Sequence, residues 1–143
     1  MPIVCTSANV DDAVFKNIYR IVDEYQTAST SITIQDKEKN VTYPVNVIYV
    51  PDITKQIRDF TSNNKKVEAS VQIDFDALYE SQGYQKCTEM HTAIENGLDA
   101  ENEQLRTARL RYKGSEVLAA SPINVNGQQV LSKSVRFDFE VLI

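Results

Sequence analysis

The sequence predicts an α+β domain, a two-layer sandwich in which two helices cover one face of a mostly antiparallel sheet. Residues 67–76 alternate apolar and polar side chains, which is typical of a strand that buries one face. Residues 84–98 then repeat apolar side chains at helical spacing, and residues 14–25 do the same near the N-terminus. Residues 135–143 alternate like a second core strand, so both helices can share one sheet.

Length and charge limit the classes of protein that the sequence fits. The chain has 143 residues, of which 42% are hydrophobic, and we expect one domain over residues 1–143. Its 15 basic and 20 acidic side chains give a net charge of -5, which argues against a surface built to neutralise phosphates. No apolar run reaches the roughly 18 residues of a membrane span, and no secretory signal precedes residue 9, so no membrane contact is expected.

The first half of the chain predicts a helix followed by two strands. Asp11 and Asp12 place acid in the first turn of a helix whose apolar repeat covers residues 14–25, and acid there suits the positive end of the helix dipole. Residues 31–36 and 41–50 alternate, and we expect two antiparallel strands. Pro44 lacks an N–H group, so the second strand should lie at an edge of the sheet or turn that position away from a partner, and Pro51 should end it.

The segment after Pro51 carries weaker signals. Apolar residues within 53–60 fit one short helical turn. Residues 61–66 are polar throughout, which indicates a mobile surface loop that orders only against a neighbouring chain. The candidate contacts with a partner in this loop are Ser62, Asn63, Asn64, Lys65 and Lys66.

The second half predicts a helix and three strands. Cys87, Met90 and Ile94 continue the apolar stripe of Tyr84, and Gly97 should end the helix in a left-handed conformation. A strand over residues 105–112 then carries Arg106, Arg109 and Arg111.

The C-terminal part reads as a turn and a hairpin. Residues 113–115 should turn the chain, and Asn126 with Gly127 should form a type I′ hairpin turn. Phe75 and Phe139 belong to uninterrupted alternating strands, so we expect both in the core.

Few residues offer catalytic or metal-binding chemistry. Cys87 and His91 lie four apart on a helix and could share a metal ion, but the chain has no second His and only a distant Cys5. A buried thiol beside a surface His, with both cysteines reduced, is the better interpretation. The glycines are scattered, so no phosphate-binding loop can be written. We expect no catalytic residues, no metal ligands and no cofactor.

Carboxylates pair on two strands and leave an alternative open. Asp74 and Asp76 share a strand face, as do Asp138 and Glu140, and these four could hold Mg²⁺ in a metal-dependent enzyme. A solvated acidic face is favoured because no Lys or His is placed for catalysis. A monomeric protein-binding module that uses the edge at residues 41–50 is the other alternative.

The order of elements, with the strand–helix unit at residues 71–98 and the C-terminal hairpin ending at 135–143, resembles the tail terminator proteins of long-tailed bacteriophages. The resemblance implies a noncatalytic structural protein that forms a ring, typically a hexamer, on the tail tube. Such a ring stops tube polymerisation and joins the tail to the head. Implied partners are the tail tube protein and a head connector or neck protein.

The resemblance also implies a place in the virion, at the head-proximal end of the tail, after assembly in the host cytoplasm. DNA would pass through the ring without sequence-specific binding. A wall facing the DNA should not bind phosphate, and we therefore infer an acidic lumen face from Glu68, Asp74, Asp76, Asp138 and Glu140. Arg106, Arg109 and Arg111 are the expected contacts with an acidic neighbour or tail partner.

Overall fold

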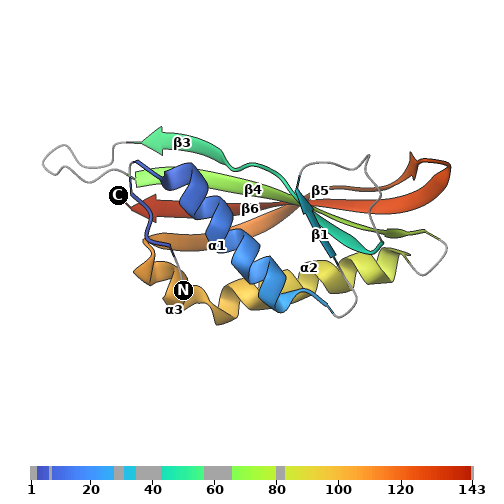
Figure 1. The fold of residues 1–143 in the computed structure, drawn as a ribbon, viewed down its shortest axis with the longest axis horizontal. Helices are drawn as coiled ribbons and strands as arrows, with labels where there is room; N and C mark the ends of the chain where they lie inside the picture. The colour runs from blue at the N-terminus through green and yellow to red at the C-terminus, as the bar shows by residue number, and fades with distance from the viewer. Residues whose placement is uncertain are drawn as a thin grey trace, which may run out of the picture.

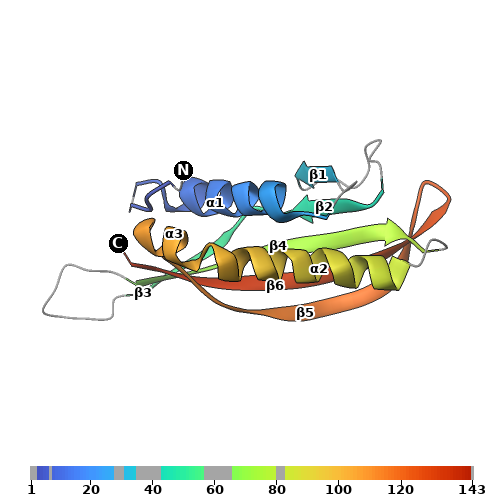
Figure 2. The ribbon, with the colours of Figure 1, turned by 90° about the horizontal axis from the view of Figure 1, so that it is seen from below.

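The computed structural model describes residues 3–6, 8–27, 31–34, 43–56, 66–79 and 83–142. Helices α1 and α2 pack on the same side of one six-stranded sheet, so the predicted α+β sandwich is confirmed (Figures 1 and 2). The helices are α1 (Val10–Tyr25), α2 (Gly83–Ala100) and α3 (Asn102–Thr107). The strands are β1 (Ser31–Ile34), β2 (Val45–Ile48), β3 (Asp52–Gln56), β4 (Lys66–Leu78), β5 (Leu110–Val125) and β6 (Gln128–Leu142).

The sheet is built on β4 and β6. Its strand order is β1-β2-β4-β6-β5, and β3 pairs with β4 beyond the end of β2. All 13 residues of β4 have an antiparallel partner in β6. Strands β2 and β3 lie end to end along the other edge of β4, opposite residues 73–76 and 66–70.

The core lies between the sheet and the two long helices. Every second residue of β4 from Val67 is buried, and Phe75, Phe137 and Phe139 are each at most 1% exposed. The predicted burial of Phe75 and Phe139 is therefore confirmed. Ile18 and Ile21 of α1 belong to the same cluster, as do buried apolar residues of α2.

The prediction that the first two strands are antiparallel is wrong, because β1 runs parallel to β2. Alternation indicates a strand but not its direction, and residues 35–44 separate the two strands by more than a tight hairpin turn. Residues 35–42 lie outside the described part of the chain. Pro44 immediately precedes β2, so it takes no N–H from the ladder. β2 pairs on both sides, so of the two expected arrangements the edge position is wrong, and Pro44 stands outside the ladder.

A strand, β3, stands where a short helical turn was expected. Ile53 packs against the core, and β4 extends beyond β2, which leaves ladder positions for β3 to fill. The predicted loop over residues 61–66 falls mostly outside the described residues. Lys66 is not a loop residue, because it begins β4.

Gly97 does not end α2 but lies buried three residues before its last residue, Ala100. A Cβ atom at this position would lie 2.6 Å from Cγ and 2.8 Å from Cβ of Tyr25 in α1. The glycine therefore allows α1 and α2 to approach closely. Tyr84, predicted to be buried, is 72% exposed, because the neighbouring Gly83 takes the sheet-facing position in the first turn.

The predicted arginine strand is also wrong. Leu105 is buried in the short helix α3, which carries Arg106, and β5 begins only at Leu110. Arg109 lies in the turn between them at φ 65°, and its carbonyl accepts the Leu142 N–H. Helical burial of Leu105 overrides the alternation that suggested a strand.

The turn predicted at residues 113–115 lies inside β5, where the register shift between Tyr112 and Gly114 skips Lys113 and pairs Gly114 with Asp138. A second shift lies between Val117 and Ala119. Pairing with β6 supplies hydrogen bonds on both sides of these irregularities. The hairpin turn is confirmed, because Asn126 and Gly127 have φ values of 51° and 82°.

Replacing Gly97 with Ala tests the close helix contact. We expect Gly97→Ala to lower the free energy of unfolding by about 1 to 3 kcal/mol, since the new methyl group forces α1 outward. Asn96→Ala, at the exposed neighbouring position, should not be destabilising because Ala favours the helix. Urea unfolding of both variants measures the difference, and equal stabilities would contradict this account of Gly97.

Candidate functional site

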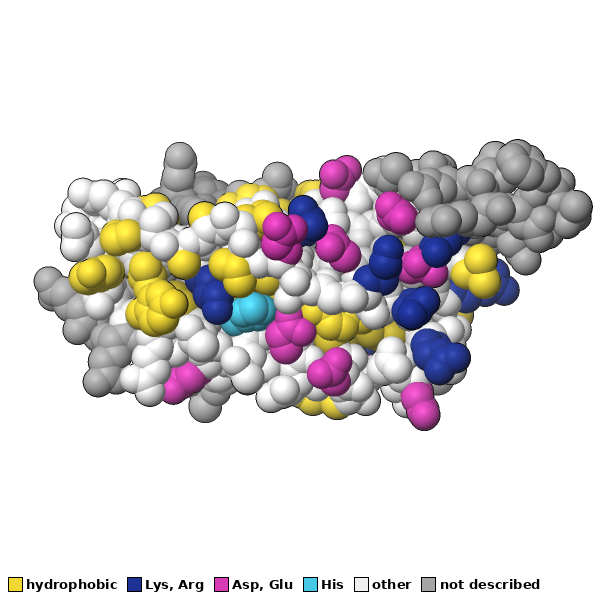
Figure 3. Space-filling model, turned by 180° about the vertical axis from the view of Figure 1, so that it is seen from behind, with side chains coloured by type: hydrophobic (Ala, Val, Ile, Leu, Met, Phe, Trp, Pro, Cys, Tyr) yellow, Lys and Arg dark blue, Asp and Glu magenta, His cyan; other side chains and the backbone are white. Residues whose placement is uncertain are grey.

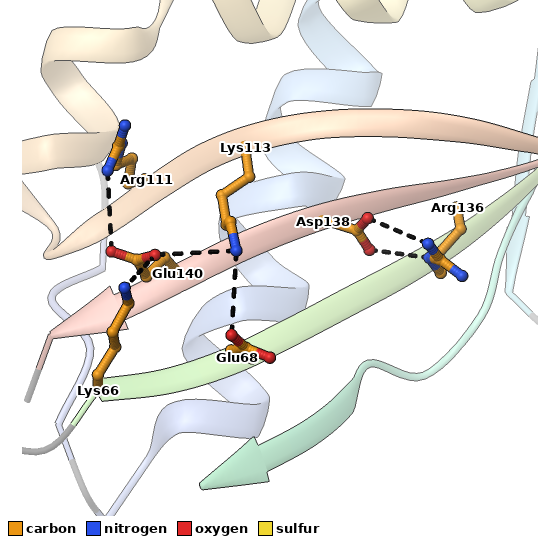
Figure 4. Close-up of polar contacts among 7 residues, drawn as sticks. All are labelled: Lys66, Glu68, Arg111, Lys113, Arg136, Asp138 and Glu140. Atoms are coloured by element: carbon orange, nitrogen blue, oxygen red, sulfur yellow. Dashed lines mark hydrogen bonds and ion pairs between the residues drawn. The ribbon is translucent and has the colours of Figure 1, made fainter. Parts of the chain in front are cut away.

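Charged side chains gather on the face of the sheet opposite the helices, towards the end where β4 begins and β6 finishes (Figures 3 and 4). They point the same way because they occupy alternate positions on neighbouring strands. We call this group the charged face. Its members are Lys66, Glu68, Arg111, Lys113, Glu116, Arg136, Asp138 and Glu140.

Glu140 is the centre of one half of the charged face. Its carboxylate lies 2.7 Å from Lys66 Nζ, 3.8 Å from Arg111 Nη1 and 3.9 Å from Lys113 Nζ (Figure 4). The hydrogen bond from Lys66 lowers the pKa of Glu140, against the opposite effect of partial burial. Glu68 stands directly opposite Glu140, and Lys113 lies 3.9 Å from it. Two facing acids repel, so these bases stabilise the pair.

Arg136 organises the other half. Its Nε lies 2.9 Å from Asp138 Oδ1, and its Nη2 lies 2.8 Å from Glu116 Oε2. A hollow of about 490 Å³ lies between the two halves, with Asp52 and Ser70 in its lining. The eight members of the charged face are four bases and four acids, so their formal charges cancel, and Asp52 in the hollow adds one negative charge beside them.

The predicted acidic face is only partly present. Glu68, Asp138 and Glu140 come together, but each lies close to a base. Asp74 and Asp76, further along β4, are each 1% exposed, so the prediction that they are solvated is wrong. Tyr49 Oη and Gln72 Nε2 donate hydrogen bonds to Asp74, at 2.9 and 3.0 Å.

The predicted partner-binding residues do not form one described surface. Arg106 and Arg109 lie in α3 and the following turn, whereas Arg111 belongs to the charged face. Ser62, Asn63, Asn64 and Lys65 lie outside the described residues, and Lys66 is paired with Glu140. Their contact with a partner stays a prediction.

The strand carboxylates do not assemble as the metal-dependent alternative requires. Asp138 and Glu140 are held by cations, and Asp74 and Asp76 are buried. Among the described residues, no three His, Cys, Asp or Glu side chains are grouped to hold a metal ion.

Cys5 and Cys87 are free and buried, as the sequence indicated for at least one of them. Burial raises the pKa of each thiol to about 11. The Cys87 thiol donates to the Phe75 carbonyl at 3.0 Å. His91 is not the expected surface residue, because its ring stacks on Phe75 and its side chain is only 14% exposed.

A second polar group, the Glu95 cluster, was not predicted. The Glu95 carboxylate accepts hydrogen bonds from Tyr112 Oη, at 2.8 Å, and from Ser115 Oγ, and it lies 3.2 Å from His91 Nε2. These contacts join α2 to β5. Tyr112 and Ser115 lie three apart and meet the same carboxylate because the strand is irregular between them. Ser115 donates to Glu95 and not to His91, so the serine, histidine and acid do not form a nucleophilic triad.

Acid should weaken the fold through His91. Burial first, and then the charge of Lys133, lower the pKa of His91, while Glu95 opposes them. The unfolded chain therefore binds the proton more readily, and stability falls as pH drops below about 6.5.

Urea unfolding at pH 7 and pH 5 measures this loss. His91→Gln should lose less stability than the wild type over that interval, because Gln does not titrate. The pKa of Glu140 is lowered from its usual value of 4.5, so the stability linked to this carboxylate is lost below the interval from pH 7 to pH 5. An equal loss in both proteins would show that His91 is not the titrating group.

Comparison with models of known protein families finds no match for the sequence, and comparison with curated proteins finds none either. Of the helices in the described ranges, none is long and apolar enough to cross a membrane.

Proposed function

We propose that the chain is a noncatalytic structural subunit like the phage tail terminators, forming a ring that caps the tail tube, stops its polymerisation and joins tail to head. The observation that carries the proposal is the charged face. It occupies the side of the sheet that the helices leave open, and its four bases are matched by four acids.

A neutral wall suits a channel for DNA. Duplex DNA carries about one negative charge per 1.7 Å, and proteins that bind it use bases whose charge is open to phosphate. Here Lys66 and Arg136 lie within 3 Å of carboxylates of their own chain. DNA can then move past the face with little attraction and little repulsion.

The layered fold supports the same role. Helices α1 and α2 occupy one side of the sheet, so a ring that turns the open side inward would place the helices outside. There they could meet the tail tube protein and the head connector or neck protein. The proposal places the ring at the head-proximal end of the tail, assembled in the host cytoplasm, without sequence-specific DNA contacts.

Assembly can be tested on the purified chain. We expect sedimentation to show an oligomer that grows with concentration towards one closed species, a hexamer in the simplest case. Negative-stain electron microscopy should then show rings with a central opening. A chain that remains monomeric at every accessible concentration would contradict the proposal.

The neutrality of the charged face can be tested separately. The triple variant Glu68→Gln, Asp138→Asn and Glu140→Gln leaves four bases against one acid, so it should retard duplex DNA in a gel. Its affinity should fall steeply with salt, because bound phosphates release counterions. The wild type should show no retardation at 0.15 M salt.

A matched control keeps the total charge the same. Asp23→Asn, Glu89→Gln and Glu103→Gln remove three exposed acids from the helices and also change the net charge from -5 to -2. This control should bind DNA far more weakly than the charged-face variant. Equal binding by both would mean that only net charge matters.

A further inference from the structure

Strands β1 and β5 are the two outer strands of the sheet that the described residues form. Within the described residues, β5 pairs only with β6, and β1 pairs only with β2. Residues 115–122 of β5 are all exposed, with Val117 and Leu118 at 48% and 46%. Ile34 of β1 is 49% exposed.

Beyond Glu116, the exposed edge of β5 carries no charge, and neither does β1. Residues 117–123 carry no charged side chain, and Ser31–Ile34 carries none. Edge strands of soluble proteins usually hold charges or bulges that prevent pairing with another chain. The register shift between Val117 and Ala119 leaves Leu118 out of the ladder with β6, so the regular part of the β5 edge begins at Ala119. Pro122 removes one N–H from the edge, so pairing should involve mainly the residues that precede it.

The two edges lie at the same level along the strands. The pairings β1–β2–β4–β6–β5 form four rows that cross the whole sheet. These rows connect Ser31 to Ser121, Ile32 to Ala120, Thr33 to Ala119, and Ile34 to Val117. A second copy can therefore add its β1 beside β5 without sliding along the strand direction.

Strand direction and symmetry agree with this arrangement. β1 is parallel to β2, and three antiparallel pairings then lead to β5, so β5 runs opposite to β1. A copy added in the same orientation pairs its β1 with β5 in the antiparallel sense, which is the commoner one. Head-to-tail contacts close into rings when repetition is a pure rotation, and they form helical filaments when each step also shifts.

We propose that β5 of one copy pairs with β1 of the next through main-chain hydrogen bonds, with Ala119 opposite Thr33 of the added copy. This inference rests on the proposed ring and names the surface that builds it. The sheet becomes continuous around the ring, and the charged faces of all copies line one side of it.

Disulfide trapping tests the pairing. Ala119→Cys combined with Thr33→Cys places thiols at facing positions of neighbouring strands, where the Cα separation suits a disulfide. Mild oxidation with copper phenanthroline should give a ladder of covalent species on denaturing gels. Its largest member should have the mass of the native oligomer.

Three controls accompany the double variant. The wild type should not cross-link, because Cys5 and Cys87 are buried. Each single variant should also remain monomeric on the gel. Tyr84→Cys combined with Thr33→Cys carries two accessible thiols, one of them on exposed Tyr84 of α2, and should give no ladder.

The outcomes separate this inference from the proposed function. A dimer formed by Ala119→Cys alone would mean that β5 faces another β5, which overturns the pairing. If the wild type forms rings but the double variant gives no ladder, the pairing is overturned and the ring is left standing. A wild type that stays monomeric at every accessible concentration would contradict the proposed function itself.

Discussion

The antiparallel pairing of β4 with β6 is the constraint on which the rest of the structure depends. Thirteen consecutive rows fix which side chains of both strands face the helices. A shift of one residue would exchange the faces and bury Glu68 or Asp138 in place of Val67 or Phe139. The same register that builds the core therefore aligns the charged face, and one pairing determines both sides of the sheet.

The sequence predicts those parts of the fold in which local pattern and tertiary packing agree. The strand containing Phe75, the helix containing Cys87 and the Asn126–Gly127 turn are all confirmed. The sequence-based prediction fails where a contact with a residue far along the chain determines the local structure. Gly97 has the local character of a helix end, but the approach of Tyr25, 72 positions earlier, makes it a packing residue. The alternation around Leu105 suggests a strand, but burial against the core makes a helix.

The candidate site was only partly predictable. Alternation placed Glu68, Asp138 and Glu140 on one face, and this was correct. Their charges are neutralised by bases from neighbouring positions and strands. One of these bases is Lys113, which lies at the register shift between Tyr112 and Gly114 in β5. Pairing across strands cannot be deduced from one strand's periodicity. The Glu95 cluster has the same origin, since it requires that register shift to bring Ser115 beside Tyr112.

The two irregularities in β5 divide the strand into parts with different tolerance to change. The base of the strand is tied to α2 through Glu95, whereas the part beyond Ala119 is paired with β6 up to Val125. We expect distortion at the tip to be absorbed at these joints. Evolution can therefore vary the length and chemistry of the hairpin tip, and so the identity of whatever meets it, while the body of the domain keeps its shape.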